Sequence, residues 1–542
     1  MNDNIFVSVR EKLNVHLVFT NRLLLTASQR GFAAPHPSGE TMKMFKAFAA
    51  VLATAALAMG TVTAGQAAGK TLTIGAIAKP VSLAADQGEY GNRVWFYQAT
   101  YDTLLKQKEN GDIIPGVATK WTYNSAQTVL TLDLRSGIKF TDGSALDAAA
   151  VVKNLNANKN SKGPTANYLA SMKSAAAKGT NQVVITLSAT DPAFVNYLAN
   201  TAGLLASPKV IGKASAATAP VGSGPYILDK AKTRSGSKYV YTANPNYWDK
   251  ANRKYDNLVI NIYEDQTAMV NALKSGAVQA GNVADPASAN TLKKAGLKSS
   301  ASYLDAKGIY FSDRSGKHNS CIAKKEVRQA INLVFDRPAL IKSLESGAGQ
   351  ATTQYFPTYS AGYNKSLDSL YPYDVASAKG LMAAAGYSKG CTITMPTFAP
   401  YFGEAVYSII SSQLGKIGIT VKEVAEGGAT FIDNILGNKY DAYLMQFERS
   451  GEPWQMLNYM LTPNATFNTD GYAKASVTKL IADYKKATAS KRPAILKAIN
   501  KAVQEDAWFS VWYAKQANFM YKSVTIKAPQ TGNIIPFLYN IG

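Results

Sequence analysis

The chain has 542 residues, 46% of them hydrophobic, and a formal net charge of +22. This length exceeds the size at which one hydrophobic core keeps growing, so we expect two or more lobes. The lysines are scattered rather than clustered, which argues against a nucleic-acid partner. The charge favours an anionic membrane surface, acidic ligands or simply solvated basic faces.

The first segment of the chain has the pattern of a secretory signal peptide. Lys43 and Lys46 form a basic start, residues 47–59 are apolar, and residues 64–68 are small. The apolar run is shorter than the roughly 20 residues that a membrane-spanning helix needs. Because the signal begins so naturally at a methionine, residues 1–41 are interpreted as an upstream extension of the reading frame. No cysteine lies at the cleavage region, so we expect a periplasmic protein without a lipid anchor.

Histidine and cysteine are scarce in the chain after that segment. The remaining chain contains only His318, Cys321 and Cys391. Nucleophilic triads and the usual zinc sites need more of these side chains, so we expect neither an enzyme nor a cofactor or metal ion. In an oxidising compartment Cys321 and Cys391 could form a disulfide that closes a loop of about 70 residues, worth on the order of 4 kcal/mol. Two free thiols are the alternative.

The elements that follow alternate strands with capped helices. Residues 71–75, 128–134 and 138–140 have the pattern of strands. Asp147 can cap a helix whose Val151, Val152 and Leu155 face inward. Asp265 can cap a helix that ends on glycine, and Asp336 with the proline that follows can start another. The cluster of glycine and proline at residues 220–226 predicts a tight turn that leads into a strand and binds no phosphate.

Several of these segments, in one order along the chain, resemble the family 5 extracellular solute-binding proteins of bacterial ABC importers, the peptide- and nickel-type binding proteins. The similar segments are residues 134–152, 220–226, 244–248, 265–276, 327–337, 371–387 and 413–419. The chain departs from the family pattern at Thr141, Ala145, Asp147, Ala150 and Ser223, and it has Ala277 and Gln279 where relatives carry acids.

The resemblance implies an α/β protein with two lobes that close around a ligand, the Venus flytrap fold of periplasmic binding proteins, with an extra subdomain in the first lobe. It implies the first lobe over residues 69–312, the second over 313–508 and a return to the first over 509–542, after the 1–68 extension and signal. It also implies a monomer that delivers a peptide-like solute to an inner-membrane ABC permease. Closure of this type places the ligand between the lobes.

The resemblance places the ligand beside residues 447–454, where peptide-binding relatives carry an aspartate for the ammonium group of the peptide. Glu448 or Glu452 would take that role here, and Arg449 would pair with the other end of the ligand. Trp454 is a further candidate for ligand contact. An unpaired charge in a closed cleft costs several kcal/mol, which is why a carboxylate partner is expected. The aromatic and weaker polar candidates for the walls are Tyr355, Phe398, Tyr401, Trp512, Tyr513, Gln87 and Tyr90. Phe140, Tyr226 and Trp248 are assigned to the core.

Other functions stay open at this point. The same transport role could serve an opine, another amino-acid derivative or an oligosaccharide, whereas nickel is disfavoured because histidine is nearly absent. An exported hydrolase is disfavoured by the single His318 and by the lack of a nucleophile motif around Ser223. A chaperone or sensor-partner role would use the same cleft.

Overall fold

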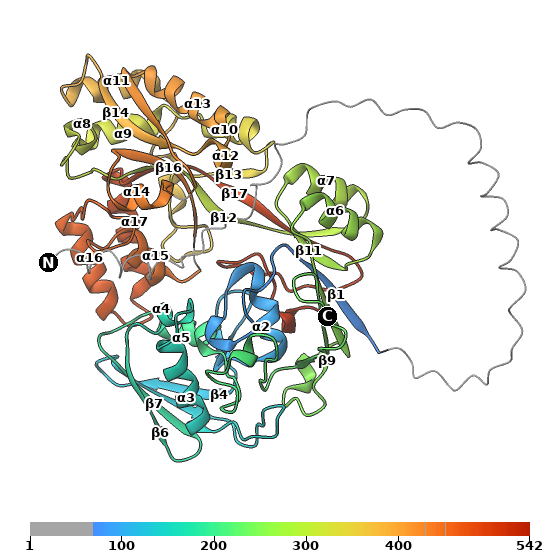
Figure 1. The fold of residues 1–542 in the computed structure, drawn as a ribbon. Coiled ribbons are helices and arrows are strands. Elements are labelled where there is room, and N and C mark those ends of the chain that lie inside the picture. The colour runs from blue at the N-terminus through green and yellow to red at the C-terminus, as the bar shows by residue number, and fades with distance from the viewer. Residues whose placement is uncertain (1–68, 429, 450) are drawn as a thin grey trace, which may run out of the picture.

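The computed structural model describes residues 69–428, 430–449 and 451–542. The predicted signal peptide lies outside these residues. Figure 1 shows two bodies, a first one drawn mainly in blue and green and a second one drawn in yellow and orange, joined by the long strands β12 and β17. Among the described residues, no helix is long and apolar enough to cross a membrane.

One nine-stranded sheet runs through both bodies. Its strands, in spatial order, are β16 (Ala442–Glu448), β12 (Lys298–Phe311), β17 (Phe509–Tyr521), β11 (Ala280–Val283), β1 (Thr71–Ala76), β10 (Asn257–Ile262), β9 (Lys238–Ala243) and β8 (Tyr226–Leu228), with β13 (Gly349–Ala351) paired to β17. β12 and β17 pair antiparallel along nearly their whole length, with irregularities between Tyr303 and Asp305 and between Lys307 and Gly308. The two strands therefore carry the chain into the second body and back.

The first body contains a second sheet and its own core. The strands of this sheet are β4 (Ala118–Tyr123), β5 (Val129–Leu134), β7 (Gln182–Leu187) and β6 (Met172–Lys178), beside the pair β2 (Leu105–Gln107) and β3 (Ile113–Pro115). The helices are α2 (Val94–Thr100), α3 (Ala148–Lys159), α4 (Thr165–Tyr168), α5 (Phe194–Leu198), α6 (Gln266–Ser275) and α7 (Pro286–Lys294). In β5 the alternation buries Leu130, Leu132 and Leu134 against α3 and its neighbours.

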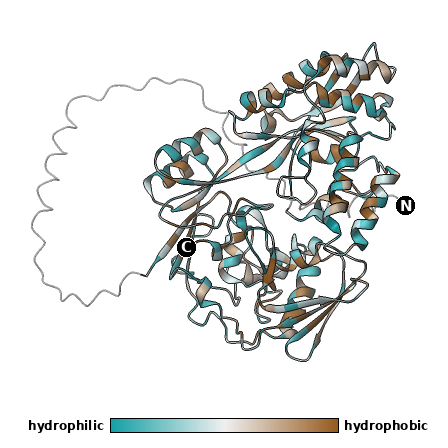
Figure 2. Cartoon of the chain, turned by 180° about the vertical axis from the view of Figure 1, so that it is seen from behind, coloured by the Kyte–Doolittle hydropathy of each residue, from teal (hydrophilic) through white to brown (hydrophobic). Residues whose placement is uncertain are grey.

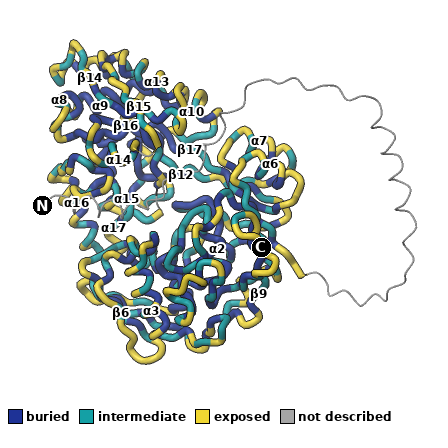
Figure 3. Tube along the Cα trace, in the orientation of Figure 1, coloured by how far each residue is buried: buried dark blue, intermediate teal, exposed yellow. Residues whose placement is uncertain are grey.

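The second body contains β14 (Cys391–Thr397) and β15 (Ile419–Ala425), which pair in parallel, and two hydrophobic cores, one beside these strands and one beside β12 and β16. Its helices are α8 (Ser320–Ala323), α9 (Lys325–Leu333), α10 (Arg337–Leu344), α11 (Val375–Ala384), α12 (Ala399–Phe402), α13 (Glu404–Gly415), α14 (Phe431–Leu436), α15 (Pro453–Met460), α16 (Ala475–Lys486) and α17 (Arg492–Glu505). Single 3-10 turns span Ala85–Gln87, Gly91–Arg93, Thr201–Gly203, Ala214–Ala217, Lys250–Asn252, Lys365–Ser369 and Leu538–Asn540. Hydrophobic residues gather on the strands and on the inner faces of these helices (Figure 2), and the buried segments run through both bodies while the outer turns are exposed (Figure 3).

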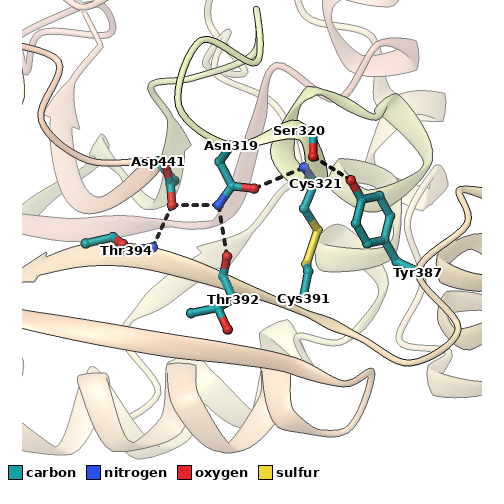
Figure 4. Close-up of a disulfide and its surroundings, with 8 residues drawn as sticks. All are labelled: Asn319, Ser320, Cys321, Tyr387, Cys391, Thr392, Thr394 and Asp441. Atoms are coloured by element: carbon teal, nitrogen blue, oxygen red, sulfur yellow. Dashed lines mark hydrogen bonds between the residues drawn. A yellow bond between two sulfur atoms is a disulfide. The ribbon is translucent and has the colours of Figure 1, made fainter.

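A disulfide joins Cys321 of α8 to Cys391 at the start of β14, with 6.5 Å between their Cα atoms. Figure 4 shows the polar contacts beside it. The Asn319 side chain accepts from the Cys321 amide at 3.0 Å and donates to an Asp441 carboxylate oxygen at 2.7 Å. The same Asp441 oxygen accepts from the Thr394 amide at 2.7 Å. The covalent bond and this network together hold α8 against β14.

Most of the predicted local elements are confirmed. Asp147, Asp265 and Asp336 each cap a helix, at 2.9, 2.8 and 3.1 Å from the backbone amide that donates to the carboxylate. The predicted strand at residues 138–140 is wrong, because the chain turns back at once. Only Lys139 pairs there, in an isolated bridge with Ala145.

The turn at residues 220–226 leads into β8 as predicted, and its glycines are required by close packing. A Cβ atom added at Gly224 would lie 2.5 Å from the backbone carbon of Thr100, and one at Gly222 would lie 2.1 Å from the Thr100 oxygen. Ser223 donates to Asp102 at 2.8 Å. Phe140 and Tyr226 are buried as expected, whereas Trp248 is half-buried and donates to Asp102 at 3.0 Å.

Gly224→Val should therefore destabilise the protein, because the added side chain collides with the backbone of α2 rather than with a movable side chain. We expect a loss of about 2 kcal/mol or more in the free energy of unfolding, measured by urea denaturation. Ligand affinity of the folded fraction should be unchanged. Normal stability combined with lost binding would contradict this assignment.

Candidate ligand-binding site

Glu448 lies at the end of β16, directly opposite Asp305 in the β12–β16 ladder. The residue is exposed to water, yet desolvation by the surrounding protein is the main influence on its carboxylate. We infer that the carboxylate lies in a recess of the molecule. In the described part of the chain, no hydrogen-bond donor or cation pairs with this carboxylate.

The environment of Glu448 disfavours its charge. Burial, and then the neighbouring charge of Asp305, raise the pKa of Glu448 to about 8. Burial also raises the pKa of Asp305, although Gln446 donates to that carboxylate at 2.6 Å. A positively charged group that entered the recess would stabilise the ionised form of Glu448.

The charge of Glu448 acts on tyrosines of both bodies. Burial raises the pKa of each of them, and the charge of Glu448 adds to the shift, which brings Tyr168 to about 12. The tyrosines are Tyr90 and Tyr168 of the first body and Tyr355, Tyr359 and Tyr459 of the second. Because Glu448 acts electrostatically on residues of both bodies, the recess lies between them.

Arg449, the next residue, is held by backbone groups of β12. Its side chain is 1% exposed, and it donates to the backbone carbonyls of Leu304, at 2.9 Å, and of Tyr303. Its own carbonyl oxygen accepts from Tyr359 at 2.6 Å. These bonds fasten the end of β16 to β12, so a ligand anion would have to displace them to reach the guanidinium.

A second pair of acids lies where the two bodies meet. Glu452 caps α15, and its carboxylate accepts from the Gln455 amide at 2.8 Å. Burial raises the pKa of Glu452 to about 7, and the charge of Asp191 in the first body adds to the shift. Asp191 accepts from Ser171 at 2.7 Å, and burial raises its pKa. On the same side, Arg492 of α17 donates to Gln127 of the first body at 3.1 Å.

The other predicted wall residues separate into two groups. Tyr401 is 41% exposed and stacks on Phe398, with 6.1 Å between the ring centroids. Burial, and then the charge of Asp305, raise the pKa of Tyr401. By contrast, Trp512 and Tyr513 are fully buried, the first beside Phe335 and the second donating to Glu345 at 2.9 Å. Their burial favours a packing role over ligand contact.

Three further predicted residues are buried or half-buried. Tyr355 is 1% exposed and packs beside Phe509. Trp454 is buried and stacks on Tyr484 at 6.3 Å. Gln87 is half-buried and donates to its neighbour Asp86 at 3.2 Å.

A groove of about 630 Å³ adjoins this region at the strands that join the bodies. It is lined by residues 300–303 of β12, Tyr359 of the second body and residues 527–530 near the C-terminus. Tyr359 also lies within electrostatic reach of Glu448.

Sequence reasoning missed Asp305, Tyr168, Tyr359, Tyr459 and Asp191. Asp305 lies opposite Glu448 only because β12 pairs with β16, and these strands are more than 100 residues apart in the sequence. Asp191 lies before a proline and resembles an ordinary turn residue. No local pattern would have identified either one.

The model of the bacterial extracellular solute-binding proteins, family 5 (middle), matches residues 112–468. The chain therefore belongs to this family of solute-binding proteins.

The chain is similar to particular members as well. It is 28% identical to di/tripeptide-binding protein 1 of Pseudomonas aeruginosa over 56% of this chain and 59% of that one. It is 26% identical to the glutathione-binding protein GsiB of Escherichia coli K12 over 76% of this chain and 81% of that one. The structure of HbpA2 from Haemophilus parasuis superimposes with a TM-score of 0.76 at 20% identity, covering 87% of this chain and 99% of that one. The match to the di/tripeptide-binding protein thus covers less than two thirds of the length of that relative. The match to HbpA2 shows the two-lobed α/β fold.

The raised pKa of Glu448 should make the ligand-free protein pH-sensitive. Because its folded-state pKa of about 8 exceeds the usual 4.5, its contribution to stability is fully present below pH 4.5 and is lost as the pH rises through 8. Glu448→Gln should therefore raise the free energy of unfolding at pH 8, by about 1–2 kcal/mol after allowance for water in the recess. It should change little at pH 4.5, as measured by urea denaturation. A difference that did not depend on pH would contradict the placement of Glu448.

Proposed function

We propose that this protein is the substrate-binding component of an ABC importer, which captures a peptide-like solute between its lobes and delivers it to an inner-membrane permease. Family membership supports a binding role without chemistry of its own. The predicted signal peptide supports a periplasmic location. The proposed lobes are residues 69–312 with 509–542, and residues 313–508.

The observation that carries the proposal is the Glu448 carboxylate in a recess lined from both bodies. Its raised pKa supports this assignment, because these surroundings disfavour the negative charge and an ammonium group would act as its partner. Asp305 adds a second carboxylate beside it. A ligand with a free amine therefore fits this recess better than an anion does.

The tyrosines suit the rest of a peptide-like ligand. The charge of Glu448 acts on Tyr90 and Tyr168 of the first body and on Tyr355 and Tyr459 of the second. Aromatic walls bury ligand surface and can hydrogen-bond without demanding one particular side chain. Because both bodies contribute, a ligand held here stabilises the closed arrangement through contacts that the open one lacks.

The relatives named for di/tripeptides and glutathione support a small peptide-like solute. An opine or another amino-acid derivative with a free amine would meet the same requirement at Glu448. An oligosaccharide would leave the carboxylate without a cationic partner.

Calorimetric titration with a panel of dipeptides and tripeptides tests the proposal. Glu448→Gln should weaken binding of the free peptides about 10- to 100-fold, because a charge-assisted hydrogen bond is lost. It should leave the weak binding of N-acetylated peptides unchanged. Glu264→Gln, an exposed position on the first body, serves as the matched control and should have no effect. Equal losses for free and acetylated peptides would contradict the ammonium contact.

Affinity should also depend on pH. Glu448 must lose its proton to pair with the ammonium group, so affinity should rise by up to about tenfold per pH unit between pH 6 and 7.5. Above pH 8 it should fall, because a peptide amine loses its own proton at about that pH. The heat of binding at pH 7 should vary with the ionisation enthalpy of the buffer, since binding releases a proton. Heats that were independent of the buffer would argue against this exchange.

A further inference from the structure

A second groove lies between the outer face of the central sheet and the hairpin that precedes β9, the strand labelled in Figure 1. It encloses about 730 Å³. Three of its lining residues are cations, Lys232, Arg234 and Lys238, and Asn257 lines the sheet side. In the described part of the chain, none of the residues that line the groove is acidic.

Backbone and side-chain hydrogen bonds hold the hairpin in shape. Asp229 accepts from the Lys232 amide at 3.1 Å and, through its carbonyl, from the Thr233 amide at 3.0 Å. The Thr233 hydroxyl accepts from the Val240 amide at 3.1 Å. The cations are therefore presented from a fixed loop, which lowers the entropy cost of binding a ligand there.

The hairpin places two like charges in directly paired positions. The Arg234 amide donates to the Lys238 carbonyl at 2.8 Å, and the Lys238 amide donates back to the Arg234 carbonyl at 2.9 Å. Side chains at such a pair lie close together, and like charges directly opposite each other are destabilising. Both residues are exposed, and neither side chain has an ion-pair partner among the described residues. An anion between them would turn this repulsion into attraction.

Lys232 adds a third cation at the edge of the same groove. Asp229 pairs with it at 3.1 Å, so the local acid neutralises Lys232 and leaves the charges of Arg234 and Lys238 uncompensated. Lys230 is a fourth exposed cation on the same hairpin. Four cations thus lie within residues 230–238.

We propose that this groove is a binding site for a phosphate-bearing anion. The Arg234 guanidinium offers the planar fork of donors that matches two phosphate oxygens, and Lys238 offers an ammonium from the opposite side of the hairpin pair. The amide of Asn257 lies on the sheet side of the groove, and Val240 and Val259 form an apolar floor there. The same chemistry is presented by a soluble phosphate ester and by the headgroup of an anionic lipid. The site does not depend on the recess around Glu448.

Two binding assays test the site and identify the source of the anion. In the first, inorganic phosphate or glycerol 3-phosphate is titrated at constant ionic strength, and the melting temperature is compared with that in chloride. In the second, the protein is sedimented with vesicles of phosphatidylcholine alone or with 30% phosphatidylglycerol. The variant Arg234→Gln/Lys238→Gln is compared with Lys293→Gln/Lys294→Gln, which removes the same charge from exposed positions on α7.

The wild-type protein should respond in at least one of the two assays, and that assay identifies the soluble or the lipid source. Arg234→Gln/Lys238→Gln should lose the thermal response, or should lose vesicle binding by on the order of 30-fold, while the α7 variant keeps the wild-type response. Without phosphate, the hairpin variant should melt at the wild-type temperature or above it, because a like-charge pair has been removed. An equal response of both variants, no response of the wild type in either assay, or a lower melting temperature of the hairpin variant in chloride would overturn the proposal.

Discussion

The pairing of β12 with β17 is the constraint on which the rest of this structure depends. The two strands run antiparallel through both bodies, and β16 joins the ladder on the far side of β12. This ladder fixes where β16 ends, and therefore where Glu448 leaves the sheet. Arg449 strengthens the same junction by donating to the carbonyl groups of β12. Glu448, the side chain proposed to recognise the ligand, thus lies at the end of a strand that pairs with these connecting strands.

The charge of the recess opposes the charge of the protein as a whole. The chain carries a net +22, yet Asp305, Glu448, Glu452 and Asp191 gather where the two bodies meet. Burial raises the pKa of each of these acids, and it brings those of Glu448 and Glu452 to about 8 and about 7, so these two carboxylates are partly protonated at neutral pH. A cationic ligand would favour the ionised form of these carboxylates. Ligand capture, proton release and closure are then expected to be coupled through one small set of carboxylates.

Local chemistry allowed much of the fold to be predicted from the sequence. Asp147, Asp265 and Asp336 cap helices because each lies just before a helical pattern, and the alternation in β5 identifies its buried face. The error at residues 138–140 came from reading an apolar triplet as a strand when the turn after it leaves room for one bridge only.

The candidate site was less predictable, because its geometry is set by residues far apart in the sequence. Glu448 and Tyr90 were expected near the ligand, and the structure places them within electrostatic reach of each other. Trp512 and Tyr513 have the same residue types as a binding wall, but β17 directs them into the core. Asp305 carries no signal of its own, since its importance comes only from the register of β12 with β16.

Native mass spectrometry of the freshly purified protein is the most direct test of the central claim that the recess holds a peptide-like solute through its amine. The account predicts a co-purifying molecule with the mass of a short peptide or amino-acid derivative, which is released when Glu448 is replaced by glutamine. A co-purifying oligosaccharide, or an amine-containing solute retained equally by the Glu448→Gln protein, would contradict it.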